Sequence, residues 1–288
     1  MEPELIADYA CETGEGPLWH PDERRLYWTD IPRGELFRYD PASGAHERCF
    51  RGPDAIGGFT LQEDGALLLF GAHGAIGVWR AGVVTPLIDG IAAEAEGRFN
   101  DVSATPEGRV LCGTMPTPAG PGRLYRLDTD GRLTVLLEGV TTSNGIGFTP
   151  DRRQVYHTDT SKRTITLFDY DGATGAIANG VPFLDLRGTA EAGMPDGMTV
   201  DAEGCIWSAR WNGGVLVRYA PDGTELARVH FPARQVSSAA FGGADLGDLY
   251  VTTAGGHDRA ANGPGAGALY RLRPGVRGLP EFRSRIAV

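Results

Sequence analysis

The chain has 288 residues, and its 37 aspartates and glutamates outnumber its 27 lysines and arginines, which gives a formal net charge of −10. This acidity argues against a nucleic-acid partner, because phosphate backbones attract basic surfaces. Hydrophobic residues make up 41% of the chain, enough for a sizeable core, and no apolar stretch reaches the roughly 18 residues of a membrane span.

The N-terminal residues and the cysteines indicate the compartment. The first four residues, Met-Glu-Pro-Glu, show neither the basic nor the apolar region of a secretory signal peptide. The four cysteines lie far apart without Cys-X-X-Cys spacing, which predicts free thiols rather than a zinc knuckle or a disulfide framework. We therefore expect a cytoplasmic protein with no membrane partner, and one domain over residues 1–288.

In chain order, an apolar strand over residues 5–9 is followed by one pattern that recurs six times. Each copy has an apolar strand, a tight turn, a second strand with aromatic residues, a third strand, and a turn leading into a fourth. The second strands are expected at residues 26–30, 67–70, 110–114, 155–159, 206–209 and 249–253. The third strands are expected at residues 34–39, 76–79, 123–127, 164–168, 214–219 and 267–272.

This repeat predicts an all-β protein, a six-bladed β-propeller with four antiparallel strands per blade. Six copies in 288 residues average about 48 residues each, which is a blade's length. A long β-sandwich is the competing fold, but it does not need an even sixfold repeat. The ring must close to avoid an unpaired strand edge. We expect the strand at 5–9 to complete the last blade; the segment 282–288 is the alternative.

The innermost strand of each blade lines the central channel, so equivalent positions on these strands meet near the axis. Counting back six residues from the turn after each inner strand gives Glu15, Gly57, Asn100, Asn144, Asp196 and Ser238. Two carboxylates in a narrow channel would repel each other and resist burial, and a divalent cation removes both problems. Carboxylate and amide oxygens suit a hard ion such as calcium or magnesium. The alternative is that these residues cap loops or hold channel water.

Seven short phrases give the sequence a family resemblance. They occupy residues 14–19, 98–101, 113–115, 143–145, 195–198, 211–214 and 241–243. In these phrases the chain resembles the SMP-30/gluconolactonase/LRE family, which contains regucalcin and bacterial sugar lactonases. The resemblance implies a six-bladed propeller with one divalent metal, held by Glu15, Asn144 and Asp196. It also implies Arg98 and Asn100 as substrate-binding residues.

The implied activity is hydrolysis of a sugar lactone, such as a glucono-, xylono-, arabino- or galactonolactone, to its aldonic acid. Asp196 would be the catalytic residue, taking a proton from the attacking water and returning it to the ring oxygen. Arg98 would bind sugar hydroxyls or the carboxylate that forms; the alternative is a surface ion pair with Glu94 or Glu96. Calcium is the first choice of ion, with zinc, manganese, magnesium and iron(II) left open.

Several alternatives stay open. The segment 116–122 is short and lacks a substrate-contacting glutamate of some family members, so their sugar preference does not carry over. A metal-dependent organophosphate or aryl-ester hydrolase and a non-catalytic calcium-binding propeller are the rival functions. Trp211 lines the channel entrance or packs between blades, and His157 is expected to be a hydrogen-bonded structural residue. The glycine-rich segment 254–267 is a lid or a plain connector. The oligomeric state is not predicted.

Overall fold

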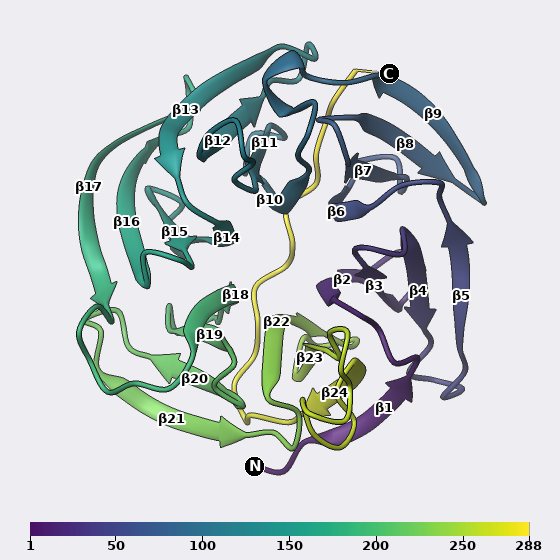
Figure 1. Cartoon of the computed structure of the whole chain (residues 1–288), viewed down its shortest axis with the longest axis vertical. Coiled ribbons are helices and arrows are strands. Elements are labelled where there is room, and N and C mark those ends of the chain that lie inside the picture. The colour runs from purple at the N-terminus through teal and green to yellow at the C-terminus, as the bar shows by residue number, and fades with distance from the viewer. Residues whose placement is uncertain (288) are drawn as a thin grey trace.

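The computed structural model describes residues 1–287 and shows six four-stranded antiparallel sheets arranged in a ring around a central axis (Figure 1). Blades one and two comprise β2 (Gly14–His20), β3 (Arg25–Asp30), β4 (Glu35–Tyr39) and β5 (His46–Arg51), then β6 (Ile56–Leu61), β7 (Leu67–Gly71), β8 (Ile76–Arg80) and β9 (Val83–Ile88). A short 3-10 helix, η1 (Ala92–Glu94), follows. The all-β, six-bladed propeller is therefore confirmed.

The next three blades repeat this order. Blade three comprises β10 (Phe99–Ala104), β11 (Val110–Thr114), β12 (Gly122–Leu127) and β13 (Leu133–Val140). Blade four comprises β14 (Ser143–Phe148), β15 (Gln154–Asp159), β16 (Thr164–Asp171) and β17 (Ala176–Asp185). Blade five comprises β18 (Met194–Val200), β19 (Ile206–Trp211), β20 (Val215–Tyr219) and β21 (Glu225–His230). Among the described residues, no helix has the length and hydropathy needed to cross a membrane.

The sixth blade is built from both ends of the chain. Its first three strands are β22 (Gln235–Gly242), β23 (Asp248–Ala254) and β24 (Ala268–Leu272), and β1 (Glu4–Asp8) is its outer strand. β1 pairs antiparallel with β24, from Glu4 opposite Arg271 to Asp8 opposite Ala268. The N-terminal strand therefore completes the last blade, as predicted, and residues 282–287 of the alternative segment take no part in that sheet; residue 288 lies outside the described residues.

The C-terminal residues 273–287, here called the strap, instead cross the face of the ring, drawn in yellow in Figure 1. The strap meets the far ends of the inner strands and the turns on that side of the ring, at the end of the channel opposite to where those strands start. Its contacts reach every blade, through Asp22, Leu61, Thr129, Phe148, Ala202 and Leu246 in blades one, two, three, four, five and six. This long-range role was not predicted, because the strap carries no copy of the sixfold pattern.

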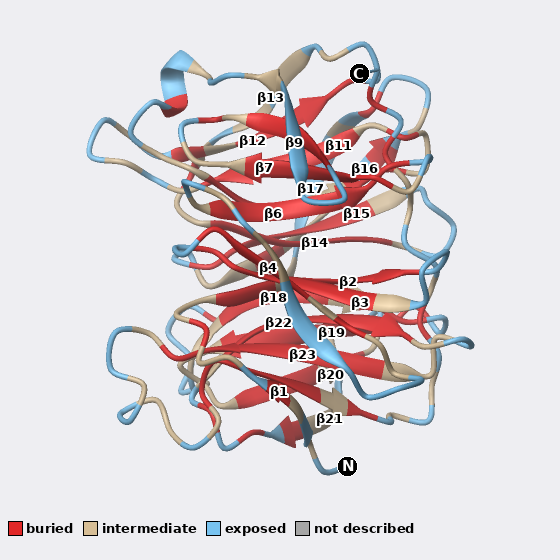
Figure 2. Cartoon of the chain, turned by 90° about the vertical axis from the view of Figure 1, so that its right-hand side faces the viewer, coloured by how far each residue is buried: buried red, intermediate tan, exposed pale blue. Residues whose placement is uncertain are grey.

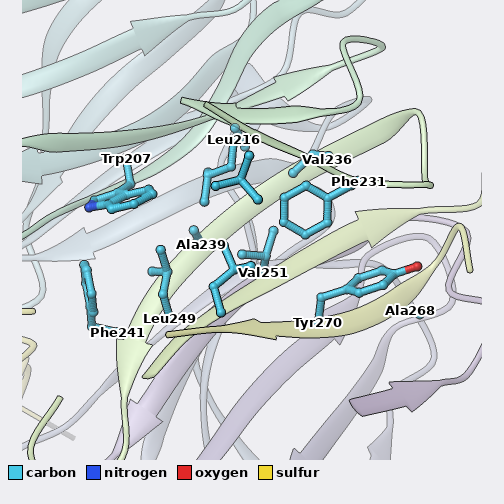
Figure 3. Packing of buried hydrophobic residues seen from close by; sticks show 13 residues of the cluster. Trp207, Leu216, Phe231, Val236, Ala239, Phe241, Leu249, Val251, Ala268 and Tyr270 are labelled. Atoms are coloured by element: carbon cyan, nitrogen blue, oxygen red, sulfur yellow. The ribbon is translucent and has the colours of Figure 1, made fainter. Parts of the chain in front are cut away.

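The core lies between neighbouring blades. Figure 2 shows buried inner strands and exposed outer strands such as β9. In Figure 3, Trp207 and Leu216 of blade five pack on Leu249 and Val251 of blade six, and Trp207 meets the Phe241 ring with 6.5 Å between centroids. Burying each such large apolar side chain stabilises the fold by roughly 1.5–3 kcal/mol. All four cysteines are free, as predicted.

Candidate active site

All five site residues predicted from the sequence line one cavity of about 290 Å³ at the end of the channel where the inner strands start. They are Glu15, Arg98, Asn100, Asn144 and Asp196. The other lining residues are Thr13, Ile31, Met115, Thr142, Thr160, Ser161, Met194 and Trp211. Residues that are up to 181 positions apart in sequence are thus brought together, because every inner strand begins near the axis.

A β-bulge interrupts each inner strand where it carries a site residue. The pairing register shifts between Glu15 and Leu18 in β2, and between Asn144 and Ile146 in β14. A bulge bends its strand and re-aims a side chain, and such bulges are common beside active sites. Gly145 lies in the β14 bulge, where an added Cβ would come within 2.7 Å of the Asp196 carbonyl oxygen. The glycine therefore allows blades four and five to approach closely at the cavity.

The sixth blade departs from the predicted ring. Ser238 pairs with Thr252 as Glu15 pairs with Thr29, but the unpaired residue of this bulge, Ser237, precedes Ser238, whereas the unpaired residues of the β2 bulge follow Glu15. Neither serine lines the cavity; Ser237 is fully buried and its hydroxyl donates to the Gly14 carbonyl oxygen across 2.6 Å.

Two buried aspartates hold the loops that lead into β2 and β14. The Asp30 carboxylate accepts hydrogen bonds from the backbone N–H groups of Glu12 and Thr13, at 2.9 and 3.0 Å. Asp159 does the same for the two residues before Ser143, at 3.0 and 3.1 Å. Because each aspartate ends the second strand of its blade, the Thr-Asp pair repeated in the sequence serves the same purpose twice. It fixes the backbone just ahead of Glu15 and Asn144.

A row of hydrogen bonds connects four blade-three and blade-four side chains in the cavity. Arg98 Nη1 donates to Asn100 Oδ1 across 2.6 Å. Asn100 Nδ2 donates to the Ser143 carbonyl oxygen at 2.8 Å and to Asn144 Oδ1 at 2.9 Å. Asn144 Nδ2 then donates to Thr160 Oγ1 at 2.8 Å. The row links the guanidinium group to an amide that the sequence predicts as a metal ligand.

The carboxylates of Glu15 and Asp196 are buried at 3% and 4% exposure, and the positive charge of Arg98 lowers their pKa values less than burial raises them. Burial first, and then the negative charge of Asp101, raise the pKa of both groups well above their usual range. Glu15 Oε2 accepts a hydrogen bond from the Gly16 N–H at 2.9 Å, and within residues 1–287 neither carboxylate forms an ion pair. Two negative groups held in this way favour a positive charge between them.

The donor set fits a hard divalent cation. Glu15 and Asp196 supply carboxylate oxygens, and Asn144 and Asn100 bring amide groups to the same cavity. Oxygen donors of this kind suit calcium, magnesium or manganese better than soft metals. Within residues 1–287 no three histidine, cysteine or acidic side chains gather closely enough to hold a metal. Asn144 is therefore the residue through which a third oxygen donor would come.

Arg98 faces the cavity rather than the surface. Its guanidinium group bonds to Asn100 and to the Phe99 carbonyl oxygen at 2.9 Å, and forms no ion pair among the described residues. Glu94, one of the two alternative partners with Glu96, instead accepts hydrogen bonds from Arg123 at 2.9 Å and from the Tyr125 hydroxyl at 2.7 Å. The surface ion pair is thus wrong, and Arg98 keeps donors available to a bound ligand.

The structure also places Trp211, His157 and the segment 254–267. Trp211 lines the cavity, and His157 is buried with its Nε2 2.9 Å from Ser143 Oγ, the structural role expected. No residue of the segment 254–267 lines the cavity, and its Arg259 pairs with Asp8 of β1 instead. That segment therefore packs beside blade six, and its contacts favour the connector over the lid.

Sequence reasoning missed Asp101 and the hydroxyl residues of the cavity. Asp101 follows Asn100 in the β10 bulge, lines the channel beyond the cavity, and burial raises its pKa to about 7. Thr160 follows the Thr-Asp pair of blade four as Ile31 follows that of blade one, and both line the cavity. The repeated pair was therefore an available signal for these two positions.

Comparison with known proteins gives consistent results. The family model described as SMP-30/Gluconolactonase/LRE-like region matches residues 13–255. Pentonolactonase XacC of Haloferax volcanii is 49% identical over 294 residues, covering 98% of this chain and 97% of the relative. L-arabinolactonase of Azospirillum brasilense is 36% identical and covers 97% of this chain and 94% of the relative. A solved calcium-binding protein, regucalcin from Agrobacterium tumefaciens, superposes with a TM-score of 0.90 at 30% identity, covering 99% and 97% of the two chains.

Proposed function

The chain belongs to the SMP-30/gluconolactonase/LRE-like family, and we propose that it is a metal-dependent sugar lactonase that opens an aldonolactone ring to the aldonic acid. The observation that carries this proposal is the pair of buried carboxylates, Glu15 and Asp196, beside Arg98 in one cavity. The names of the relatives support lactone hydrolysis, and pentonolactones and arabinolactone are the first substrates to test.

Glu15, Asn144 and Asp196 would hold the ion. When bound, a divalent cation supplies Lewis-acid chemistry that polarises a carbonyl group and stabilises the negative charge that develops on its oxygen. Calcium is the first choice for this donor set, and magnesium, manganese, zinc and iron(II) are the alternatives. The solved regucalcin described as calcium-binding supports calcium first.

The chain's own residues would carry the proton transfers. Asp196 is the base that takes a proton from the attacking water, and its buried carboxylate holds a proton more readily than an exposed one. It then returns the proton to the ring oxygen as the carbon–oxygen bond breaks. Because that oxygen leaves as an alcohol, its protonation completes the ring opening.

Arg98 and Asn100 would bind and orient the sugar. The guanidinium group has five N–H donors, and only part of them is used by Asn100 and the Phe99 carbonyl oxygen. The free donors suit sugar hydroxyls before the reaction and the carboxylate after it. Arg98 Nη1 donates to Asn100 Oδ1, and this hydrogen bond fixes the orientation of the Asn100 amide.

The test is a pH-indicator assay over a panel of aldonolactones, with protein that is stripped by a chelator and refilled with one ion at a time. We expect ion-dependent acid release from five-carbon lactones, and its loss in Asp196→Ala. Asp130→Asn, an exposed turn residue, is the control and keeps full activity. Ion-dependent turnover of a phosphotriester or phenyl acetate in place of lactones supports the rival hydrolase. No turnover of any substrate with any ion favours a non-catalytic propeller and overturns the proposal.

A further inference from the structure

The side-chain amide of Asn144 must present a particular atom to the cavity. An amide group has nearly the same shape when its oxygen and nitrogen exchange places, but only the oxygen can donate electrons to a cation. Something in the protein must therefore fix which atom lies where. The row of hydrogen bonds from Arg98 to Thr160 fixes it. Which amide atom donates and which accepts follows from groups in the row that can only donate or only accept.

The direction is set at the Arg98 end. A guanidinium group only donates, so the Asn100 atom 2.6 Å from Arg98 Nη1 is the oxygen. The other amide atom of Asn100 is then the nitrogen, and it faces the Ser143 carbonyl oxygen, which only accepts. The Asn144 atom 2.9 Å from this nitrogen must also accept, so it is Oδ1.

The other end of the row is Thr160. Since Oδ1 of Asn144 faces Asn100, Nδ2 points the other way and lies 2.8 Å from Thr160 Oγ1. Thr160 is 5% exposed, and its backbone is held on both sides. Its N–H donates to the Thr142 carbonyl oxygen at 3.0 Å, and its carbonyl oxygen accepts from the Arg163 N–H at 2.9 Å. The threonine hydroxyl is therefore a fixed acceptor for the Asn144 nitrogen.

We propose that Thr160 is a positioning residue that locks the Asn144 amide so that its oxygen stays available as a ligand of the divalent ion. This inference rests on the proposed function, because it assigns Thr160 to the same ion site. Without the hydroxyl, the buried Nδ2 keeps only the Asp196 carboxylate as an acceptor, and that carboxylate is itself a proposed ligand of the ion, so the amide is no longer locked when the ion binds. Residues that orient a metal ligand typically contribute 10–100-fold to metal affinity.

The chain offers matched variants. Thr160→Val keeps the volume of the side chain but removes the acceptor, and Thr160→Ser keeps the acceptor but removes a methyl group. Thr158→Val is the control, two residues earlier at the end of β15 and directly opposite Asn144. Its hydroxyl is buried and has no hydrogen-bond partner within residues 1–287, so the same substitution removes no contact.

The experiment measures the binding of calcium alone and of manganese alone to chelator-treated protein by isothermal titration calorimetry, with urea unfolding of each metal-free variant alongside. We expect a dissociation constant 10–100-fold higher in Thr160→Val, and values within threefold of the wild type in Thr160→Ser and Thr158→Val. Should Thr160→Val not fold, Thr160→Ala carries the same expectation.

The outcomes separate the two proposals. Wild-type affinity in Thr160→Val overturns the positioning role and leaves the proposed lactonase intact. Weaker binding in Thr158→Val as well, or no recovery in Thr160→Ser, also overturns it, because the effect would then come from packing. A wild-type protein that binds neither ion, yet releases acid from lactones, overturns the ion site itself and the role of Thr160 with it.

Discussion

Gly113 and Ser143 meet between blades three and four, where the missing side chain of Gly113 leaves the space that the Ser143 hydroxyl fills. Ser143 is fully buried, its Oγ lies 2.9 Å from His157 Nε2, and its carbonyl oxygen accepts from Asn100. Because Ser143 directly precedes Asn144, this contact between blades three and four positions the backbone from which the Asn144 side chain extends.

Gly113→Ala is expected to destabilise the protein by about 1–3 kcal/mol, because a Cβ at this position collides with the Ser143 side chain. Urea unfolding measures the loss. Adding Ser143→Gly to the same chain removes the collision and should recover part of the stability, so the two changes should not be additive. Wild-type stability in Gly113→Ala would show that the blades can move apart there without cost.

Asp159→Asn is expected to cost about 1–3 kcal/mol, because an amide nitrogen would then face backbone N–H donors of the loop before β14. The ion affinity should fall too, since this loop positions Asn144. Asp130→Asn, at an exposed turn where the carboxylate accepts from the Arg132 N–H, is the matched control and should change stability by less than about 0.5 kcal/mol. Equal losses in the two variants would contradict the role given to Asp159.

The pH dependence of stability should report on His157. Burial lowers the pKa of this histidine from 6.5 to about 4. Between those two pH values the unfolded chain binds a proton that the folded chain does not, so stability is retained above pH 6.5 and lost as the pH falls toward 4. The full loss is about 3 kcal/mol.

Urea unfolding from pH 8 to pH 4 checks this expectation with His157→Gln, which cannot titrate. The variant should lose less stability than the wild type across that range. Glutamine at the exposed His230 is the control and should follow the wild type. Parallel curves for the wild type and His157→Gln would show that the buried imidazole does not contribute to the acid loss.

In metal-free protein, the candidate site should make folding stability decrease as the pH rises, the reverse of the effect that most carboxylates have. Burial and neighbouring negative charges raise the pKa of Glu15 and Asp196 in the metal-free fold. Between the ordinary pKa of about 4 and the raised pKa, the folded chain binds more protons than the unfolded chain, so the stability of chelated protein should fall as the pH rises through that interval. Melting temperatures at pH 6 and pH 8 measure this, and calcium should restore the loss at pH 8.

The double variant Glu15→Gln, Asp196→Asn is the comparison for that measurement. Without the two carboxylates, the chelated protein should lose this part of the pH dependence and should no longer respond to calcium. A calcium response that survives in the double variant would place the ion elsewhere.

More of the fold than of the cavity could be predicted from the sequence. The aromatic second strands recur at even spacing, and this is sufficient to predict six blades and the closure by β1. The same spacing found Glu15, Asn100, Asn144 and Asp196, because equivalent positions of a ring meet at its axis. Arg98 came only from the family resemblance, since it lies before the inner strand rather than on it.

The errors and omissions have local physical causes. Ser238 shares the pairing position of Glu15 but does not line the cavity, and the bulge of β22 lies before it rather than after it, a difference that the spacing does not reveal. Thr160 was missed because its importance depends on the direction of an amide group in a neighbouring strand. The contact between Gly113 and Ser143 joins separate blades, and the strap has no repeat to mark its path.

The strap connects the blades in a second way, besides the pairing of β1 with β24. Among the described strands β1 pairs with β24 alone, whereas the strap touches all six blades, through contacts such as Ser284 N–H to the Leu61 carbonyl oxygen at 2.8 Å. No blade can swing outward without disturbing this shared segment. A chain shortened after residue 272 would keep every sheet but lose what ties them together, so its melting should broaden from one cooperative step into a gradual, blade-by-blade loosening.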